Sequence, residues 1–120
     1  MTMKASALAL ALLAAPSMAL AQSSPMQGMD MKGATSPATQ DYMRAMQGMN
    51  EKMQGMKPAN DPSMDFVMMM KPHHQAAVEM AQAYLKYGTD PKLKRMAQDV
   101  VSNQKKEIKE MTAWEKRHGM

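Results

Sequence analysis

The sequence predicts an all-α fold, an antiparallel helical hairpin preceded by a methionine-rich helix. Apolar residues recur with helical spacing in three segments, and this spacing is the mark of amphipathic helices. Two of the segments open with Asp-Pro, a pair that caps and starts helices. No run of alternating apolar and polar residues indicates a β-strand.

Residues 1–21 are predicted to be a cleaved secretory signal. Lys4 supplies a positive charge, a run of residues 5–15 is apolar apart from Ser6, and the small-residue pattern A-L-A occupies residues 19–21. No later apolar run reaches the roughly 18 residues that a membrane span needs. We therefore expect a periplasmic protein with no membrane span after signal cleavage.

Methionine dominates the composition, with 19 among 120 residues, and cysteine is absent. The chain after the signal holds only seven Leu, Ile and Val residues, so thioethers must supply much of the apolar surface. Without cysteine there is neither a disulfide framework nor a thiolate metal site. The net charge of +4 with 4% aromatic residues argues against a nucleic-acid interface.

Residues 22–39 have the polar, Pro- and Gly-containing composition of a flexible tail. From residue 40 to 57 a helix is predicted, with a methionine stripe on one side. The tetrapeptide MQGM occurs in the tail and twice in this helix. Two internal glycines each cost the helix roughly 1 kcal/mol relative to alanine, so it should be marginal on its own.

Two longer helices are predicted over residues 62–87 and 91–118, completing a helical metal-binding domain at residues 40–120. Gly88 is expected to end the first of them in the left-handed conformation. Because the connection is so short, these two helices should form an antiparallel hairpin.

The densest group of potential metal ligands is the run M-M-M-K-P-H-H at residues 68–74. Met69 and Met70 lie three or four residues before the imidazoles of His73 and His74, so thioether and imidazole can share a helix face. The two histidines point about 100° apart, which requires either two neighbouring sites or one site with a kink at Pro72.

Folding the hairpin about Thr89 places this histidine pair opposite Gln104, whose amide is then expected to orient an imidazole. Thioether and imidazole together suit Cu(I) and Ag(I) better than Mg, Ca or Mn.

Over about residues 65–114, including the M-M-K-P-H-H run and a downstream Q-x-x-E-I-x-x-M, the chain resembles the CopM-like exported copper-binding family. The resemblance implies a ferritin-like helical bundle and a periplasmic copper-binding function. The positions that match the family motif are His73, His74, Met80, Gln104 and Met111. The resemblance leaves open whether two hairpins dimerise to complete the bundle.

The sequence therefore predicts a Cu(I) or Ag(I) binding protein, not an enzyme, that sequesters copper or delivers it to a copper-transport partner. The expected ligands are His73, His74, Met69, Met70, Met80 and Met111. Gln104 is expected to orient an imidazole without binding the metal itself. A looser methionine array is expected from Met26, Met29, Met31, Met43, Met46, Met49, Met53 and Met56. The alternative is a methionine-rich interaction or oxidant-scavenging protein that binds no metal.

A di-iron enzyme would need two Glu-x-x-His motifs. Only residues 115–118 fit that pattern, which argues against this class.

Overall fold

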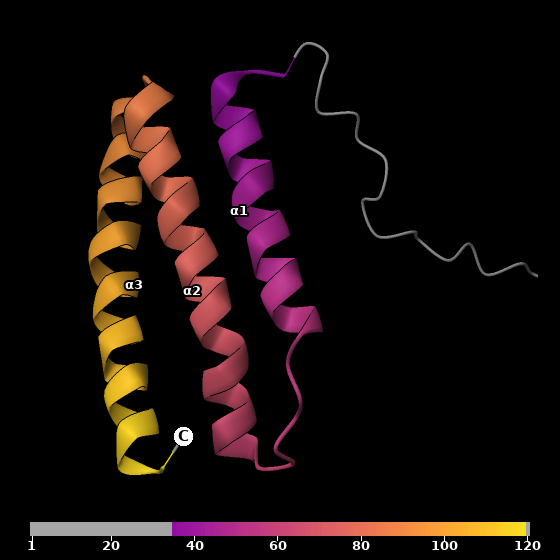
Figure 1. Ribbon diagram of the computed structural model, residues 1–120. Coiled ribbons are helices and arrows are strands. Elements are labelled where there is room, and N and C mark those ends of the chain that lie inside the picture. The colour runs from indigo at the N-terminus through magenta and orange to yellow at the C-terminus, as the bar shows by residue number, and fades with distance from the viewer. Residues whose placement is uncertain (1–34, 120) are drawn as a thin grey trace, which may run out of the picture.

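The computed structural model describes residues 35–119, which form three α-helices and no strand (Figure 1). The helices are α1 (Pro37–Gln54), α2 (Pro62–Tyr87) and α3 (Pro91–Arg117). They confirm the predicted all-α fold. The predicted signal and most of the predicted tail lie outside the described residues. None of the three helices described is both long and apolar enough to cross a membrane.

Each helix begins with a polar cap followed by proline. Asp61 caps α2 and Asp90 caps α3, each accepting a hydrogen bond from a first-turn N–H at 2.9 Å. Ser36 caps α1 in the same way, accepting from the N–H of Thr39 at 3.2 Å. These caps satisfy donors that have no partner inside the helix, and the following proline lacks such a donor. The cap and proline together explain where each helix starts.

The bounds of α1 differ from the prediction at both ends. The helix begins at Pro37 rather than residue 40, so the predicted tail of residues 22–39 extends too far. It ends at Gln54 rather than residue 57, and the N–H of Gly55 donates to the carbonyl of Glu51 at 3.1 Å. Pro58 disfavours helical geometry at the residue before it. Glycine and proline together therefore end the helix before the last methionine of the stripe.

Gly88 ends α2 differently from the prediction. Its backbone is extended, with φ −75° and ψ 152°, and not left-handed. A side chain at this position would collide with the ring of Tyr84. The Tyr84 hydroxyl in turn accepts a hydrogen bond from the N–H of Asp90 at 3.3 Å. Glycine is therefore required here by the close approach of an aromatic ring, and not by backbone conformation.

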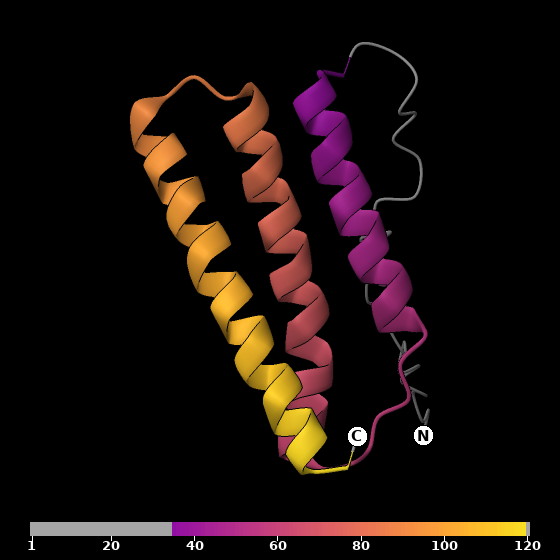
Figure 2. The same ribbon diagram turned by 60° about the vertical axis from the view of Figure 1, so that its left-hand side comes forward.

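The three helices form an open layer with α2 in the middle. In two views 60° apart, α1 and α3 lie on opposite sides of α2 (Figures 1 and 2). Helix α2 contacts both neighbours, whereas α1 and α3 do not contact each other. The α2–α3 hairpin is antiparallel, as predicted, and α1 extends the layer on the other side.

Small side chains fill the buried seams between the helices. Apart from His74, the buried residues are Ala45, Val67, Ala76, Val78, Ala81, Ala83 and Ala97. Among residues 35–119 no large side chain is fully buried. Small residues let helices approach closely, so the methionines lie at the edges of the seams, where most are half-buried.

Candidate metal centre

His74 is the one buried polar residue among those described, and it links α2 to α3. Its Nδ1 lies 2.9 Å from the carbonyl oxygen of Met70, and its Nε2 lies 2.5 Å from Oε2 of Glu107. Each ring nitrogen therefore already lies within hydrogen-bond distance of a protein oxygen atom. A metal ion could reach Nε2 only after the contact with Glu107 opened.

The partner of His74 is thus Glu107 and not Gln104, which was expected to orient the ring. The two residues lie three apart on α3, which is nearly one helical turn. A second ion pair, 2.5 Å between Lys71 Nζ and Glu115 Oε2, joins the same two helices. Simple folding about Thr89 would place residue 104 opposite His74 and residue 107 opposite Lys71, so both observed partners lie further along α3, by about one turn for His74 and about two turns for Lys71.

His73 does not share the environment of its neighbour. Its side chain is exposed, whereas His74 is buried. This difference agrees with the expected angle of about 100° between adjacent helical residues. The two imidazoles therefore do not converge on one position in this structure.

The other predicted ligands are also spread along the hairpin. Met70 contributes its carbonyl oxygen to His74. Met80 follows ten residues later on α2, about 15 Å along the helix axis, which is too far for both thioethers to bind one ion. Met111 lies on the α3 side of the layer, in a groove with Phe66 and Trp114. The structure does not gather the predicted histidine and methionine ligands at a single point.

Four methionines do gather in one pocket, between the end of α1 and the first half of α2. The pocket has a volume of about 310 Å³. Its lining consists of Met53, Met56, Pro58, Asp65, Met68 and Met69. We call it the methionine pocket. Two of its thioethers belong to the third MQGM copy and two belong to the M-M-M run, so it joins the two methionine-rich motifs of the described chain.

The loop between α1 and α2 holds the two sides of this pocket together. Asp65 Oδ1 accepts a hydrogen bond from the N–H of Ala59 at 2.7 Å, which ties the loop to α2. Asn60 takes a left-handed backbone with φ 57°, allowing the chain to reverse, and asparagine tolerates this conformation better than most residues. The reversal brings Met53 and Met56 back alongside α2.

The pocket suits a soft metal ion chemically. A thioether is a soft, uncharged ligand that favours Cu(I) over harder cations. Within residues 35–119, no three His, Asp or Glu side chains lie close enough to hold a metal ion together. That finding concerns nitrogen and oxygen ligands alone and does not bear on thioethers.

The remaining methionines of the predicted array have different positions. Met43 and Met49 are half-buried on α1, and Met46 is 38% exposed. None of the three lines the methionine pocket. Met26, Met29 and Met31 lie outside the described residues.

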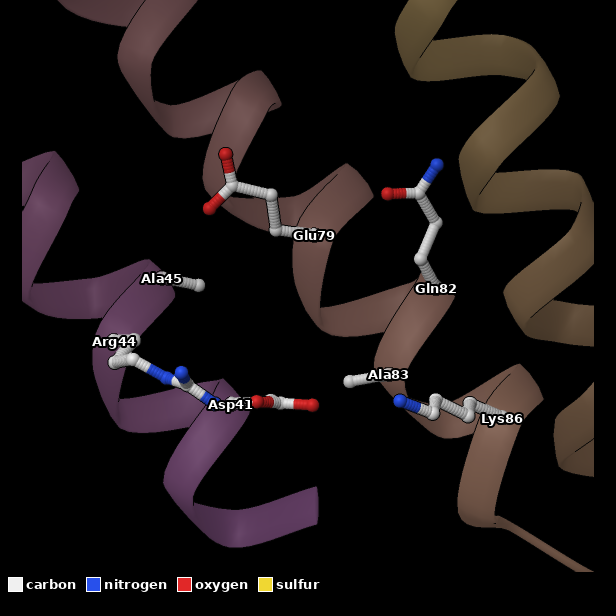
Figure 3. A pocket seen from close by; sticks show the side chains of 7 residues that line it. All are labelled: Asp41, Arg44, Ala45, Glu79, Gln82, Ala83 and Lys86. Atoms are coloured by element: carbon white, nitrogen blue, oxygen red, sulfur yellow. Dashed lines mark hydrogen bonds and ion pairs between the residues drawn. The ribbon is translucent and has the colours of Figure 1, made fainter. Parts of the chain in front are cut away.

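A second pocket between α1 and α2 has a different character (Figure 3). Its volume is about 360 Å³, and it is lined by Asp41, Arg44, Ala45, Glu79, Gln82, Ala83 and Lys86. Asp41 pairs with Arg44 and extends toward Lys86 across the pocket (Figure 3). A hydrogen bond with Tyr87 raises the pKa of the Lys86 amine above its ordinary value. This pocket contains no thioether or imidazole, so it offers nothing to a soft metal.

Sequence reasoning did not place Met68 or Asp65 among the site residues. The signal was available in the turn at residues 58–61. Antiparallel helices joined by a short turn place residues equidistant from it opposite each other. By this rule, Met53 and Met56, which precede the turn, lie near the start of α2, which follows it.

Residues 11–115 match the protein family described as "Domain of unknown function (DUF305)". The match covers all three MQGM copies, the M-M-M run and the histidine pair. No curated protein matches this chain.

Proposed function

We propose that this chain, which belongs to the family described as a domain of unknown function (DUF305), binds Cu(I) or Ag(I) in the methionine pocket. The family description itself assigns no activity. Met53, Met56, Met68 and Met69 are the proposed ligands. The protein acts as a metal-binding protein and not as an enzyme.

The observation that carries this proposal is that four methionines, from α1, the loop after it and α2, line one small pocket. A single methionine at a helix seam is ordinary packing, since methionine fills irregular gaps well. Four methionines around one pocket, in a chain with no cysteine, provide instead a group of soft thioether ligands. Their position at a loop tied down by Asp65 also keeps the two pairs near each other.

The histidine pair is not part of the proposed site. Each ring nitrogen of His74 already lies within hydrogen-bond distance of a protein oxygen atom, and the side chain of His73 is exposed. Glu115, which begins the Glu-x-x-His pattern, pairs with Lys71, while Nδ1 of His118 lies 2.8 Å from the carbonyl of Trp114.

The wider role follows from the chemistry: the exported protein sequesters copper in the periplasm or passes it to a transport partner.

An anaerobic Cu(I) titration against a chromophoric chelator tests the proposal. Met53→Leu combined with Met68→Leu removes one thioether from each helix and keeps side-chain volume nearly constant, a change that usually costs less than about 1.5 kcal/mol of stability. Loss of an outer-shell partner already weakens metal binding about 10- to 100-fold, so loss of two direct ligands should weaken it at least as much.

The matched control is Met80→Leu combined with Met96→Leu, two methionines outside the pocket. This variant should bind Cu(I) as tightly as the original chain. Equal weakening in both double variants would show that the methionines act as a diffuse array without a defined site.

A second candidate function is supported by an apolar groove between α2 and α3. Phe66 is 60% exposed there, beside Met111 and Trp114, in a groove of about 610 Å³. Exposed aromatic residues beside methionine are typical of surfaces that bind apolar partners. Metal analysis of the protein purified from the periplasm separates the two functions, because a partner-binding protein would carry no stoichiometric copper.

A further inference from the structure

We propose that Met69 is a site of sulfoxide formation by peroxide, and that its oxidation lowers the affinity of the methionine pocket for soft metal ions. The inference rests on the proposed function of this pocket. It adds a modification site, a class of reagent and a consequence for the metal.

Met69 differs from the other pocket methionines in exposure. Its residue surface is 48% exposed, whereas Met53, Met56 and Met68 are half-buried. Oxidation of a thioether requires that the oxidant reach sulfur, so susceptibility follows exposure. Met69 is therefore the pocket ligand that peroxide reaches first.

The reaction balances with hydrogen peroxide as the oxidant. The Met69 sulfur attacks one peroxide oxygen, a sulfur–oxygen bond forms, and the oxygen–oxygen bond breaks. Sulfur loses two electrons, and the other oxygen leaves as water after proton transfer. The product is methionine sulfoxide, a polar group that methionine sulfoxide reductases convert back to the thioether.

Oxidation and metal binding compete at the same sulfur atom. A sulfur that donates electron density to Cu(I) or Ag(I) is a weaker and less accessible nucleophile toward peroxide, and a sulfoxide is no longer a soft thioether ligand. Metal should thus protect Met69, and prior oxidation of Met69 should remove one of four ligands.

Met96 provides an internal control. It lies on α3, outside the methionine pocket, and is 55% exposed. Exposure alone predicts that Met69 and Met96 oxidise at similar rates whether or not metal is present. Ligation predicts that metal protects Met69 alone.

The experiment exposes the protein to hydrogen peroxide in chloride-free buffer, with and without Ag(I), and follows each methionine by tandem mass spectrometry. Without Ag(I), Met69 and Met96 should oxidise before Met53 and Met68. With free Ag(I) at about ten times Kd, roughly a tenth of the sites stays empty, so Met69 should oxidise about tenfold more slowly. The rate at Met96 should not change.

The second arm measures Ag(I) affinity before and after a mild exposure that oxidises Met69 and Met96 but spares Met53 and Met68. The original chain and Met96→Leu should lose at least about tenfold in affinity, by comparison with the cost of losing an outer-shell partner. Met69→Leu should keep its starting affinity through the treatment.

Each outcome separates the two claims. A chain that binds no Ag(I) before oxidation contradicts the proposed function, and with it this inference. Tight Ag(I) binding with equal oxidation of Met69 and Met96 in its presence overturns the inference and removes Met69 from the proposed ligands, while metal binding by the chain stands. Unchanged affinity after complete oxidation of Met69 overturns it as well.

Discussion

His74 and Met69 lie five residues apart on α2, yet their surroundings give them different roles. The imidazole is buried and held between a carbonyl and a carboxylate. The thioether is half-exposed beside three others. Ligand type alone would rank the imidazole first, but a ligand must also have a free lone pair directed at the metal. In this fold the four methionines line a pocket, whereas each ring nitrogen of His74 already faces a protein oxygen atom.

At the residue scale, we predict that His74→Ala lowers the free energy of unfolding by about 2 kcal/mol, because it removes a buried side chain with two hydrogen bonds. Cu(I) affinity should remain within about twofold of the original, well under the tenfold effect expected for a ligand. Urea unfolding and chelator competition measure the two quantities.

The matched control is His73→Ala on the same helix, which should change neither stability nor affinity because that side chain is exposed. A large loss of Cu(I) affinity in His74→Ala with unchanged stability would instead show that the imidazole is a ligand and that its contact with Glu107 opens when metal binds.

At the element scale, the sequence predicted α2 and α3 within one residue because Asp-Pro caps and short connections leave few alternatives. The start of α1 was missed although Ser36-Pro37 is the same kind of signal. It lies in a polar segment without apolar periodicity, so the methionine stripe alone predicts a start at residue 40. Caps depend on one or two local hydrogen bonds, and these operate whether or not an apolar stripe follows.

The site was less predictable than the helices. Composition indicated that methionines would supply much of the apolar surface, but the pairing of Met53 and Met56 with α2 depends on how the loop at residues 58–61 turns. The left-handed Asn60 and the bond from Ala59 to Asp65 decide that turn. The partner of His74, Glu107, lies about one helical turn beyond the predicted Gln104. Apolar periodicity does not determine the register of two helices to within one turn.

Helix α1 is the shortest of the three described helices and has a glycine, Gly48, in its interior, whereas α3 is joined to α2 through the contacts of Lys71 and His74. Each of the two outer helices has one buried residue and contacts α2 alone. We predict that the amides of α1 exchange hydrogen faster than those of α2 and α3, and that Ag(I) slows this exchange. A metal that binds only the ordered arrangement stabilises it by mass action. Hydrogen exchange with and without Ag(I) measures the effect.

Gly48→Ala is the matched variant for this helix. An added Cβ at this position meets no other atom within 4 Å, and alanine in place of glycine stabilises a helix interior by about 1 kcal/mol. It should slow exchange in α1 without metal, in the same direction as Ag(I). Exchange in α1 as slow as in α2 before metal is added would mean that the methionine stripe is ordinary core packing.

At the scale of the whole molecule, an open layer explains why two kinds of surface coexist. Helix α2 presents the methionine pocket toward α1 and the apolar groove toward α3. Because α1 and α3 do not contact each other, changes at one seam need not disturb the other. Metal bound at the α1 seam should therefore leave the ion pairs of the α2–α3 hairpin in place.

The central claim is that thioethers, and not imidazoles, hold the metal. X-ray absorption at the copper K-edge, recorded on the protein loaded with one equivalent of Cu(I), tests this most directly because sulfur and nitrogen neighbours scatter differently. The account predicts a first shell of sulfur atoms alone, with fewer of them in Met53→Leu combined with Met68→Leu. A shell containing the outer-ring scattering of imidazole, unchanged in that variant, would contradict it.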